Sequence, residues 1–331
     1  MSRHPIPTLS IRCVTGLSNR LSALTSGRAL AEASGRAFQM LWPRTSSCGA
    51  TFAELFSNEW GVSEAISRGN APARFSPMRR SVDVLNDPTP EIHIDCVGSL
   101  LDPSRFRRHA ALAQRDVELL QQLKPVTALA HAIDEFRARH FRAAMIGVHL
   151  RRGDFVRFHG DTVNNTKQAM AAIDKLLART PEAGIFLCSD DGAATYWGGT
   201  DLPSEGVHKK FQVRYGSRVV WRPASLDRRQ SAAIQDALID LWLLRQTTAF
   251  VGSRASSFSR LVLHGRSVPS VLCRGYNLKY AVAESLCRAT GIYFLMRYHC
   301  QKRHGSAVSF PVMGQYYKTR LLQAFTRKGA K

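Results

Sequence analysis

Residues 9–42 decide the fold, and they read LSIRCVTGLSNRLSALTSGRALAEASGRAFQMLW. Leu9–Val14 is an apolar-rich run that predicts a β-strand, and a short polar turn containing Gly16 follows it. An Ala-rich stretch then shows helical spacing up to Gly35, where a glycine that ends a helix is expected. Phe38–Trp42 predicts a second strand. Strand, turn, helix and strand make a βαβ unit, so we predict an α/β fold with a parallel sheet.

The second part of the chain repeats this alternation of strands and helices. Met145–Leu150, Gly184–Cys188 and Ala249–Gly252 have the apolar character of buried strands, and Ser231–Arg245 has the periodicity of a helix. No internal repeat of the length found in solenoid proteins is visible. We therefore expect a second α/β unit after the first.

A chain of 331 residues is long enough for two domains of ordinary size. We place the boundary near residue 143. This predicts an N-terminal domain of residues 1–143, a C-terminal domain of residues 144–300 and a basic tail of residues 301–331.

The charge of the chain is strongly positive. Lys and Arg number 46 against 25 Asp and Glu, a formal net charge of +21. Such a field attracts nucleic acid, an anionic membrane or a phosphorylated substrate, although a basic surface without a specific target has the same composition. After Glu284 the chain has no acidic residue, so we expect the tail to contact an anionic surface peripherally, or alternatively to pack back onto the N-terminal domain. No nucleic-acid-binding motif is present, and we expect no nucleic-acid partner.

The cysteines indicate a reducing compartment. There are seven, an odd number, and no two form a C-x-x-C pair. This pattern fits neither a zinc site nor a disulfide framework, so we expect reduced thiols. Without a signal-peptide pattern, and without an apolar run of about 18 residues, we expect a soluble or peripheral cytoplasmic protein.

Polar residues after the predicted strands are the candidates for a functional site, because ligands of open α/β sheets bind beyond the carboxyl ends of strands. Four clusters qualify: residues 15–20, 149–154, 189–191 and 253–259. In the second of them, Arg151 and Arg152 are adjacent, and a guanidinium donates two parallel hydrogen bonds to phosphate oxygens. The alternative is that Arg152 and Asp154 simply pair with each other or with neighbouring residues.

The other three clusters have equally open interpretations. Asp190 and Asp191 suit a metal, the N–H groups of a base, or the cap of a helix. Ser256 and Ser257 suit a phosphate at the start of a helix, or ordinary capping. The turn with Gly16 has neither the G-x-G-x-x-G spacing nor that of a P-loop, so it is weak evidence of a nucleotide.

Taken together, the clusters resemble the α1,6-fucosyltransferase superfamily, which includes NodZ-like enzymes and protein O-fucosyltransferases. The peptide GVHLRRGD of residues 147–154 resembles the family's H-x-R-R-x-D peptide, and FLCSDD of residues 186–191 resembles its second peptide. Residues 236–259 are similar to the third, a helix, a strand and a Ser-rich turn. GLSNR of residues 16–20 is similar to the family's N-terminal loop.

The resemblance implies a GT-B architecture, two Rossmann-like domains facing across a cleft. It implies an inverting transferase that moves fucose from GDP-fucose to a glycan acceptor, with no metal and no further cofactor. Arg151 would contact the donor diphosphate and stabilise the departing GDP. The other donor-binding residues that the resemblance implies are His149, Arg152, Asp190, Asp191, Asp240, Ser256, Ser257, Gly16 and Asn19.

The general base is left open between His159, Asp154 and Asp161. Phe155 stands where some family members carry a lysine, and His159 falls where some carry an acidic residue. A histidine in a polar loop is also commonly a solvent-exposed bystander. Two other functions remain open: transfer from another GDP-sugar, and non-catalytic binding of a polyanion.

Overall fold

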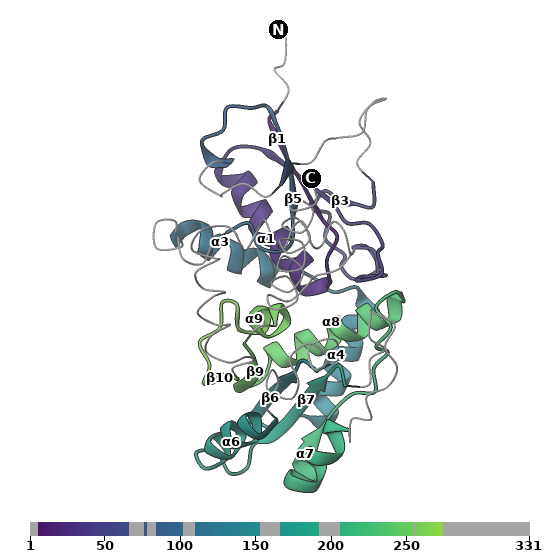
Figure 1. Cartoon of the computed structure of the whole chain (residues 1–331), viewed down its shortest axis with the longest axis vertical. Helices are drawn as coiled ribbons and strands as arrows, with labels where there is room; N and C mark the ends of the chain where they lie inside the picture. Colours follow the sequence, from purple (N-terminus) through teal and green to yellow (C-terminus); the bar gives the residue numbers. More distant parts are fainter. Residues whose placement is uncertain are drawn as a thin grey trace, which may run out of the picture.

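The computed structural model describes residues 6–65, 76–77, 84–101, 110–152, 166–191, 206–254 and 256–273. These residues form two five-stranded sheets, one above the other in Figure 1, with helices packed on them. The strand pairs within each sheet are parallel. The predicted α/β class with two Rossmann-like units is confirmed.

The first sheet has the order β3-β2-β1-β5-β4, and α1 and α3 pack against each other beside it. Its elements are β1 (Thr8–Cys13), α1 (Leu17–Ala33), β2 (Ala37–Leu41), β3 (Val62–Ser63), β4 (Ser76–Pro77), β5 (Glu91–Cys96) and α3 (Ala110–Gln122). The βαβ unit predicted for residues 9–42 is present. Gly35 follows the end of α1, as expected, and its φ of 65° lies in the left-handed region that favours glycine.

The second sheet has the order β10-β9-β6-β7-β8. Its elements are α4 (Thr127–His140), β6 (Met145–Leu150), α6 (Thr166–Leu177), β7 (Gly184–Ser189), α7 (Val207–Tyr215), a 3₁₀ turn (Gly216–Arg218), β8 (Val219–Val220), α8 (Ser231–Arg245), β9 (Ala249–Ser253), α9 (Ser257–Leu263) and β10 (Ser270–Cys273). α4 comes before the first strand of the second sheet in the chain, and it packs against α8 of the same unit. The domain boundary near residue 143 stays a prediction.

Helices cover the second sheet on both faces. Every residue of β6 is buried, which is the pattern of a central parallel strand. Ile146, Val148 and Leu150 lie in one apolar cluster, while Met145 lies in the other, larger one. The two faces of β6 therefore pack against different apolar clusters.

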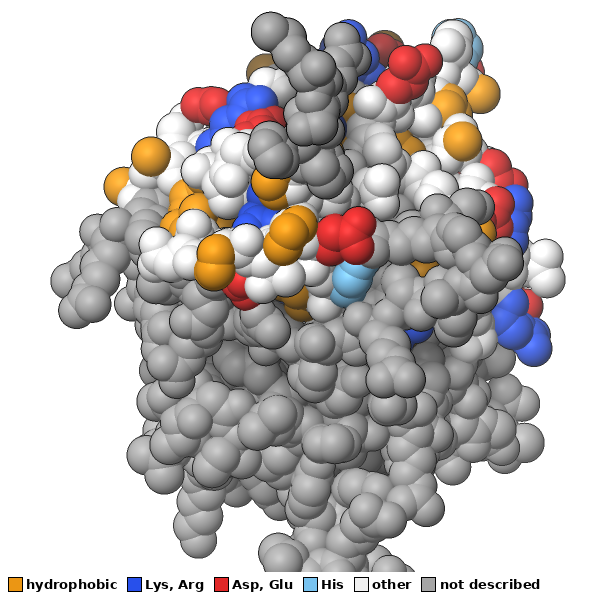
Figure 2. Space-filling view, turned by 90° about the horizontal axis from the view of Figure 1, so that it is seen from above, with side chains coloured by type: hydrophobic (Ala, Val, Ile, Leu, Met, Phe, Trp, Pro, Cys, Tyr) orange, Lys and Arg blue, Asp and Glu red, His pale blue; other side chains and the backbone are white. Residues whose placement is uncertain are grey.

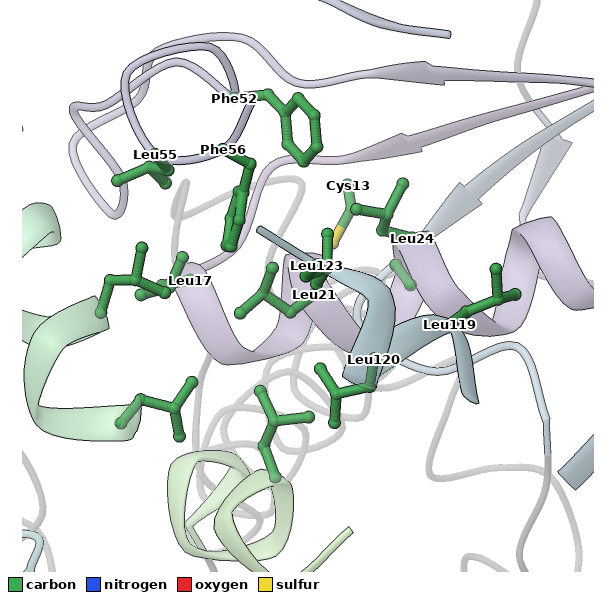
Figure 3. Packing of buried hydrophobic residues seen from close by; sticks show 14 of the residues in the cluster. Cys13, Leu17, Leu21, Leu24, Phe52, Leu55, Phe56, Leu119, Leu120 and Leu123 are labelled. Carbon is green, nitrogen blue, oxygen red and sulfur yellow. The ribbon is translucent and has the colours of Figure 1, made fainter. Parts of the chain in front are cut away.

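Aromatic side chains connect the two halves of the molecule. Trp42 packs edge-on against Phe52 with ring centroids 5.7 Å apart, and Phe52 lies 5.2 Å from Phe56. Phe56 in turn lies 5.7 Å from Trp242 of α8. Figure 3 shows Phe56 above Leu21 of α1. A single apolar core therefore contains residues from the first half of the chain and from α8 of the second half.

The segment that follows β2 contains a single helical turn: Thr51 and Glu54 exchange capping hydrogen bonds of 2.7 and 3.3 Å. The chain then leaves the turn because Phe56 pairs with Pro125 in an isolated bridge.

The surface of the described residues carries charges of both signs. On the face shown in Figure 2, Lys and Arg side chains lie beside Asp and Glu side chains. Arg115, for example, contacts Glu32 at 2.7 Å and Glu118 at 3.2 Å. None of the helices in the described ranges is long and apolar enough to cross a membrane. The basic tail of residues 301–331 lies outside the described residues.

Candidate functional site

Three of the four polar clusters meet at the carboxyl ends of neighbouring strands. The register pairs His149 of β6 with Cys188 of β7 and with Gly252 of β9. The residues after these positions, 150–152, 189–191 and 253–259, therefore leave the sheet at the same edge. This is the edge at which open α/β sheets bind ligands.

Arg151 is held at this edge by its side chain and by its backbone. Its Nη1 lies 2.9 Å from Oδ2 of Asp190, and its backbone N–H donates to Ser253 Oγ at 3.1 Å. The side chain is 18% exposed. A planar guanidinium in this position can donate two parallel hydrogen bonds to a phosphate group.

Arg152 points elsewhere and is enclosed by partners. Its Nε donates to Asp191 Oδ1 at 3.0 Å, and its Nη1 donates to Thr166 Oγ1 at 3.0 Å. Asp191 also accepts from the backbone N–H of Val207, where α7 begins, at 2.8 Å. The pair therefore joins β6, β7, α6 and α7. The alternative partner considered from the sequence, Asp154, lies outside the described residues.

Asp190 contacts more than one cation. It pairs with Arg151 and also with Arg228, whose Nη2 lies 3.4 Å from the same Oδ2, and its Oδ1 accepts from the backbone N–H of Arg152 at 2.5 Å. Burial acts to raise the pKa of Asp190, but Arg151 and Arg228 outweigh it and the pKa is lower than usual. Asp190 is thus a carboxylate that orients two guanidiniums. Arg228 belongs to none of the four clusters, and nothing near it in the sequence indicated this position.

His149 is buried under the site. Its Nδ1 lies 2.7 Å from Ser259 Oγ, and its ring stacks on Phe258 with centroids 4.6 Å apart. Ser259 Oγ also accepts from the backbone N–H of Ser253 at 3.0 Å. Burial lowers the pKa of His149 to about 4, so the imidazole is neutral at pH 7.

Asp240 lies on α8 in a separate ion-pair cluster. Arg222 donates to Asp240 Oδ1 at 3.1 Å and to Asp236 Oδ1 at 3.1 Å. Burial raises the pKa of Asp240 to about 6, although Arg222 acts in the opposite direction. The side chain of Cys188 forms a hydrogen bond with Asp240, and Cys188 lies next to His149 in the strand register. Asp240 therefore lies beneath the same part of the sheet as His149.

The pH dependence of stability should report the burial of His149. Its pKa of about 4 in the folded protein lies below its ordinary value of 6.5, so the unfolded chain binds the proton first as the pH falls. We expect acidification through this range to cost up to about 3 kcal/mol of unfolding free energy from this group. His149→Gln should remove that loss. The measurement is urea denaturation of both proteins at several pH values between these limits.

The difference between the two proteins is the informative quantity. The raised pKa of Asp240 works the other way, because the folded protein binds its proton first and gains stability as the pH falls. Asp240 titrates in wild type and variant alike, so its contribution cancels in the comparison. An equal pH dependence in both proteins would contradict the buried, neutral His149.

The serines of the third peptide divide into two groups. Ser256 is the residue before α9 and is buried, and Ser257 is the first residue of the helix. Their predicted contact with phosphate stays a prediction. Ser253 and Ser259, which sequence reasoning did not assign to the donor, support the end of β6 through Arg151 and His149. Their presence in the same Ser-rich turn was the available signal.

Gly16 and Asn19 lie in the first half, at the start of α1. The backbone N–H of Asn19 donates to the carbonyl of Gly16 at 3.1 Å, and Asn19 is buried. α1 contacts α9, so this turn and the Ser-rich turn belong to adjoining helices. A direct role in donor binding for Gly16 and Asn19 stays a prediction.

The candidates for the general base, His159, Asp154 and Asp161, all lie outside the described residues. Within the described ranges no three His, Cys, Asp or Glu side chains gather in a way that could hold a metal ion. None of the five described cysteines forms a disulfide, and the expectation of a reducing compartment stays a prediction. The expectation that the reaction needs no metal stays a prediction.

The fold is similar to that of solved fucosyltransferase structures. NodZ α-1,6-fucosyltransferase co-crystallised with GDP is 20% identical over 78% of this chain and 92% of its own, with a TM-score of 0.54. NodZ from Bradyrhizobium is 19% identical over the same shares, with a TM-score of 0.52. POFUT1 in complex with GDP-fucose is 12% identical over 80% of this chain and 98% of its own, with a TM-score of 0.50.

No protein-family model and no curated protein sequence matches the chain. The likeness to NodZ and POFUT1 is therefore one of architecture, and it agrees with the GT-B arrangement that the sequence motifs implied. The chain has the fold of the GT-B fucosyltransferases.

Proposed function

We propose that this protein is an inverting, metal-independent glycosyltransferase that transfers fucose from GDP-fucose to a glycan acceptor. The observation that carries the proposal is Arg151, held by Asp190 and Ser253 at the carboxyl end of β6 in a GT-B fold. NodZ, which has this fold, is described with GDP and with GDP-fucose. These likenesses support a GDP-sugar as the donor of the present chain.

The chemistry requires a cation where the donor bond breaks. As the anomeric carbon loses the β-phosphate, negative charge accumulates on GDP, and a preorganised guanidinium stabilises it there. Arg151 supplies this charge, and Asp190 keeps the guanidinium in place. An acceptor hydroxyl attacks the opposite face of the sugar, with His159, Asp154 or Asp161 as the candidate base.

The enclosed geometry of Arg152 supports a different role for the second arginine. Because Asp191 and Thr166 both accept from its guanidinium, Arg152 holds α6 and α7 at the edge of the sheet. It shapes the donor site from behind, and the neutral His149 underneath it adds no further charge.

Nucleotide binding separates this proposal from its alternatives. Thermal unfolding should shift upward with GDP and GDP-fucose, and not with UDP or a random oligonucleotide. A ligand present at about 100 times its Kd stabilises the folded protein by roughly 2.7 kcal/mol, which is readily detected. A shift with the oligonucleotide alone would favour the polyanion-binding alternative. A larger shift with another GDP-sugar than with GDP-fucose would identify that sugar nucleotide as the donor instead.

Turnover in EDTA tests the metal-independent part of the proposal. With GDP-fucose and an array of glycan acceptors, release of GDP should continue at an unchanged rate in EDTA, because Arg151 supplies the positive charge. Loss of turnover in EDTA that Mg²⁺ or Mn²⁺ restores would show that the reaction uses a divalent cation. The array also identifies the acceptor.

A further inference from the structure

We propose that Arg228 is a further donor-binding arginine, and that Gly49, in the first half of the chain, positions it. The proposal rests on the proposed function, because the donor diphosphate is the anion that Arg228 would contact. It adds a residue that lies in none of the peptides that resemble the fucosyltransferases.

The first observation is that two guanidiniums converge on one carboxylate oxygen. Arg151 Nη1 lies 2.9 Å and Arg228 Nη2 lies 3.4 Å from Oδ2 of Asp190. The single negative charge of Asp190 balances only one of these two positive charges, and a further anion with several oxygens would balance the other. A diphosphate can place one oxygen on each guanidinium. The 38% exposure of the Arg228 side chain leaves it accessible from solvent.

The second observation is the shape of the loop that carries Arg228. The carbonyl of Asp227 accepts from the backbone N–H of Gln230 at 2.9 Å, which closes a turn. Arg229 folds back on Asp227, with Nε and Nη2 donating to the two carboxylate oxygens at 2.8 and 2.9 Å. Arg229 is 71% exposed, so adjacent arginines of one turn face different surroundings. Only Arg228 of the two faces Asp190.

The third observation is the contact between this turn and Gly49. The backbone N–H of Gly49 donates to the carbonyl of Arg228 at 2.8 Å. A Cβ atom at position 49 would lie 2.0 Å from the carbonyl oxygen of Arg229 and 3.0 Å from the N of Gln230. Both are backbone atoms, so any side chain at position 49 must push the turn away. Glycine is required here for close approach.

The first half of the chain holds Gly49 rigidly. Thr45 and Cys48 exchange backbone hydrogen bonds of 2.9 and 3.1 Å, and Arg44 Nη1 donates to the carbonyl of Gly49 at 2.7 Å. Buried Arg20 of α1 donates to Thr45 Oγ1 at 2.9 Å. A connected series of contacts therefore runs from α1 through the loop of residues 44–49 to Arg228. Through it the first half sets the position of a cation in the donor site.

Calorimetric titration with GDP tests the proposal on the full chain. Arg228→Ala should raise the Kd for GDP roughly tenfold, the low end of what a charge-assisted hydrogen bond contributes. Arg229→Ala removes the same charge from the adjacent position and is the matched control. Its Kd should stay close to that of the wild type. Equal effects of the two variants would overturn the proposal, because the contribution would then be one of net charge alone.

A double-mutant cycle tests the role of Gly49 as a positioning residue. Gly49→Ala should raise the Kd for GDP by roughly threefold to tenfold in the wild-type background, and should have no further effect in the Arg228→Ala background. A merely structural effect would add to that of Arg228→Ala, and additivity would overturn this part. Gly206→Ala is the steric control, since a Cβ there meets no atom of the described residues within 4 Å.

A second variant keeps the test decisive where Gly49→Ala does not fold. Arg44→Gln removes the donor to the Gly49 carbonyl without adding an atom at position 49. It should raise the Kd for GDP in the wild-type background and have no further effect on the Kd in the Arg228→Ala background. An unchanged Kd in Arg44→Gln would overturn the positioning role. If the wild type itself does not bind GDP, the proposed function fails and this proposal fails with it. If the wild type binds GDP and Arg228→Ala binds it equally well, only this proposal fails.

Discussion

Arg151→Ala should lower kcat by about 10²–10³ while the protein remains folded, because removing one transition-state charge contact costs roughly 3–4 kcal/mol. Arg151→Lys should be nearly as slow. A lysine ammonium is a single point of charge and cannot reproduce the planar fork of the guanidinium. The measurement is steady-state kinetics of fucose transfer, once an acceptor is identified, together with donor hydrolysis.

The contacts of Arg151 make this a test of chemistry rather than of folding. Its side chain is partly exposed and has Asp190 as an ion-pair partner, and Arg228 remains beside that carboxylate when Arg151 is removed. The unfolding temperature should therefore change little. Arg139→Ala is a suitable control, because Arg139 forms an exposed ion pair with Glu135 on α4. An Arg151→Ala enzyme with more than about a third of the wild-type kcat would exclude the assigned role.

Arg20→Met should lower the free energy of unfolding by about 3–5 kcal/mol, more than any other substitution proposed for this protein. The Arg20 side chain is fully buried, and its three hydrogen bonds go to Thr15 O at 2.6 Å, Pro43 O at 2.7 Å and Thr45 Oγ1 at 2.9 Å. Its guanidinium also lies 5.2 Å from the ring centroid of Trp42. Methionine keeps an apolar stem but leaves the acceptors of Thr15, Pro43 and Thr45 without this donor.

Urea denaturation followed by circular dichroism measures this loss. Arg28→Met on the same helix is the control, because Arg28 forms a partly exposed i,i+4 pair with Glu32 and should contribute about 1 kcal/mol or less. Equal losses for the two variants would contradict the structural role of Arg20. Because Arg20 also fixes Thr45, a folded fraction of the Arg20 variant should bind GDP more weakly, in line with Gly49→Ala.

Local pattern determined the regular elements. Met145–Leu150 and Ser231–Arg245 have the predicted bounds in the structure, because each combines a clear periodicity with an unambiguous end. The two-residue strand β3 and the edge strand β10 were not predicted. They are too short, or too exposed at Val271, to have a pattern of their own, and pairing with β2 and β9 creates them.

Strand-end position likewise indicated the site. Parallel strands place their carboxyl ends together, so the sequence alone assigns the clusters at 149–154, 189–191 and 253–259 to one edge, and the register agrees. Which of the two adjacent arginines faces a ligand could not be assigned by pattern. Arg152 is held away from the ligand side because α6 brings Thr166 to its guanidinium and α7 brings the N–H of Val207 to Asp191.

The sequence by itself determined the α/β alternation, the βαβ unit of residues 9–42 and the strand ends that carry Arg151 and Asp190. These are properties of neighbouring residues, set by periodicity and by the identity of turn residues such as Gly35. Only the tertiary structure decided that Arg228 joins Arg151 on Asp190 and that Gly49 supports it from the first half. The physical reason is that such contacts depend on how two sheets pack. No local pattern records a backbone approach between residues that lie about 180 positions apart in the chain.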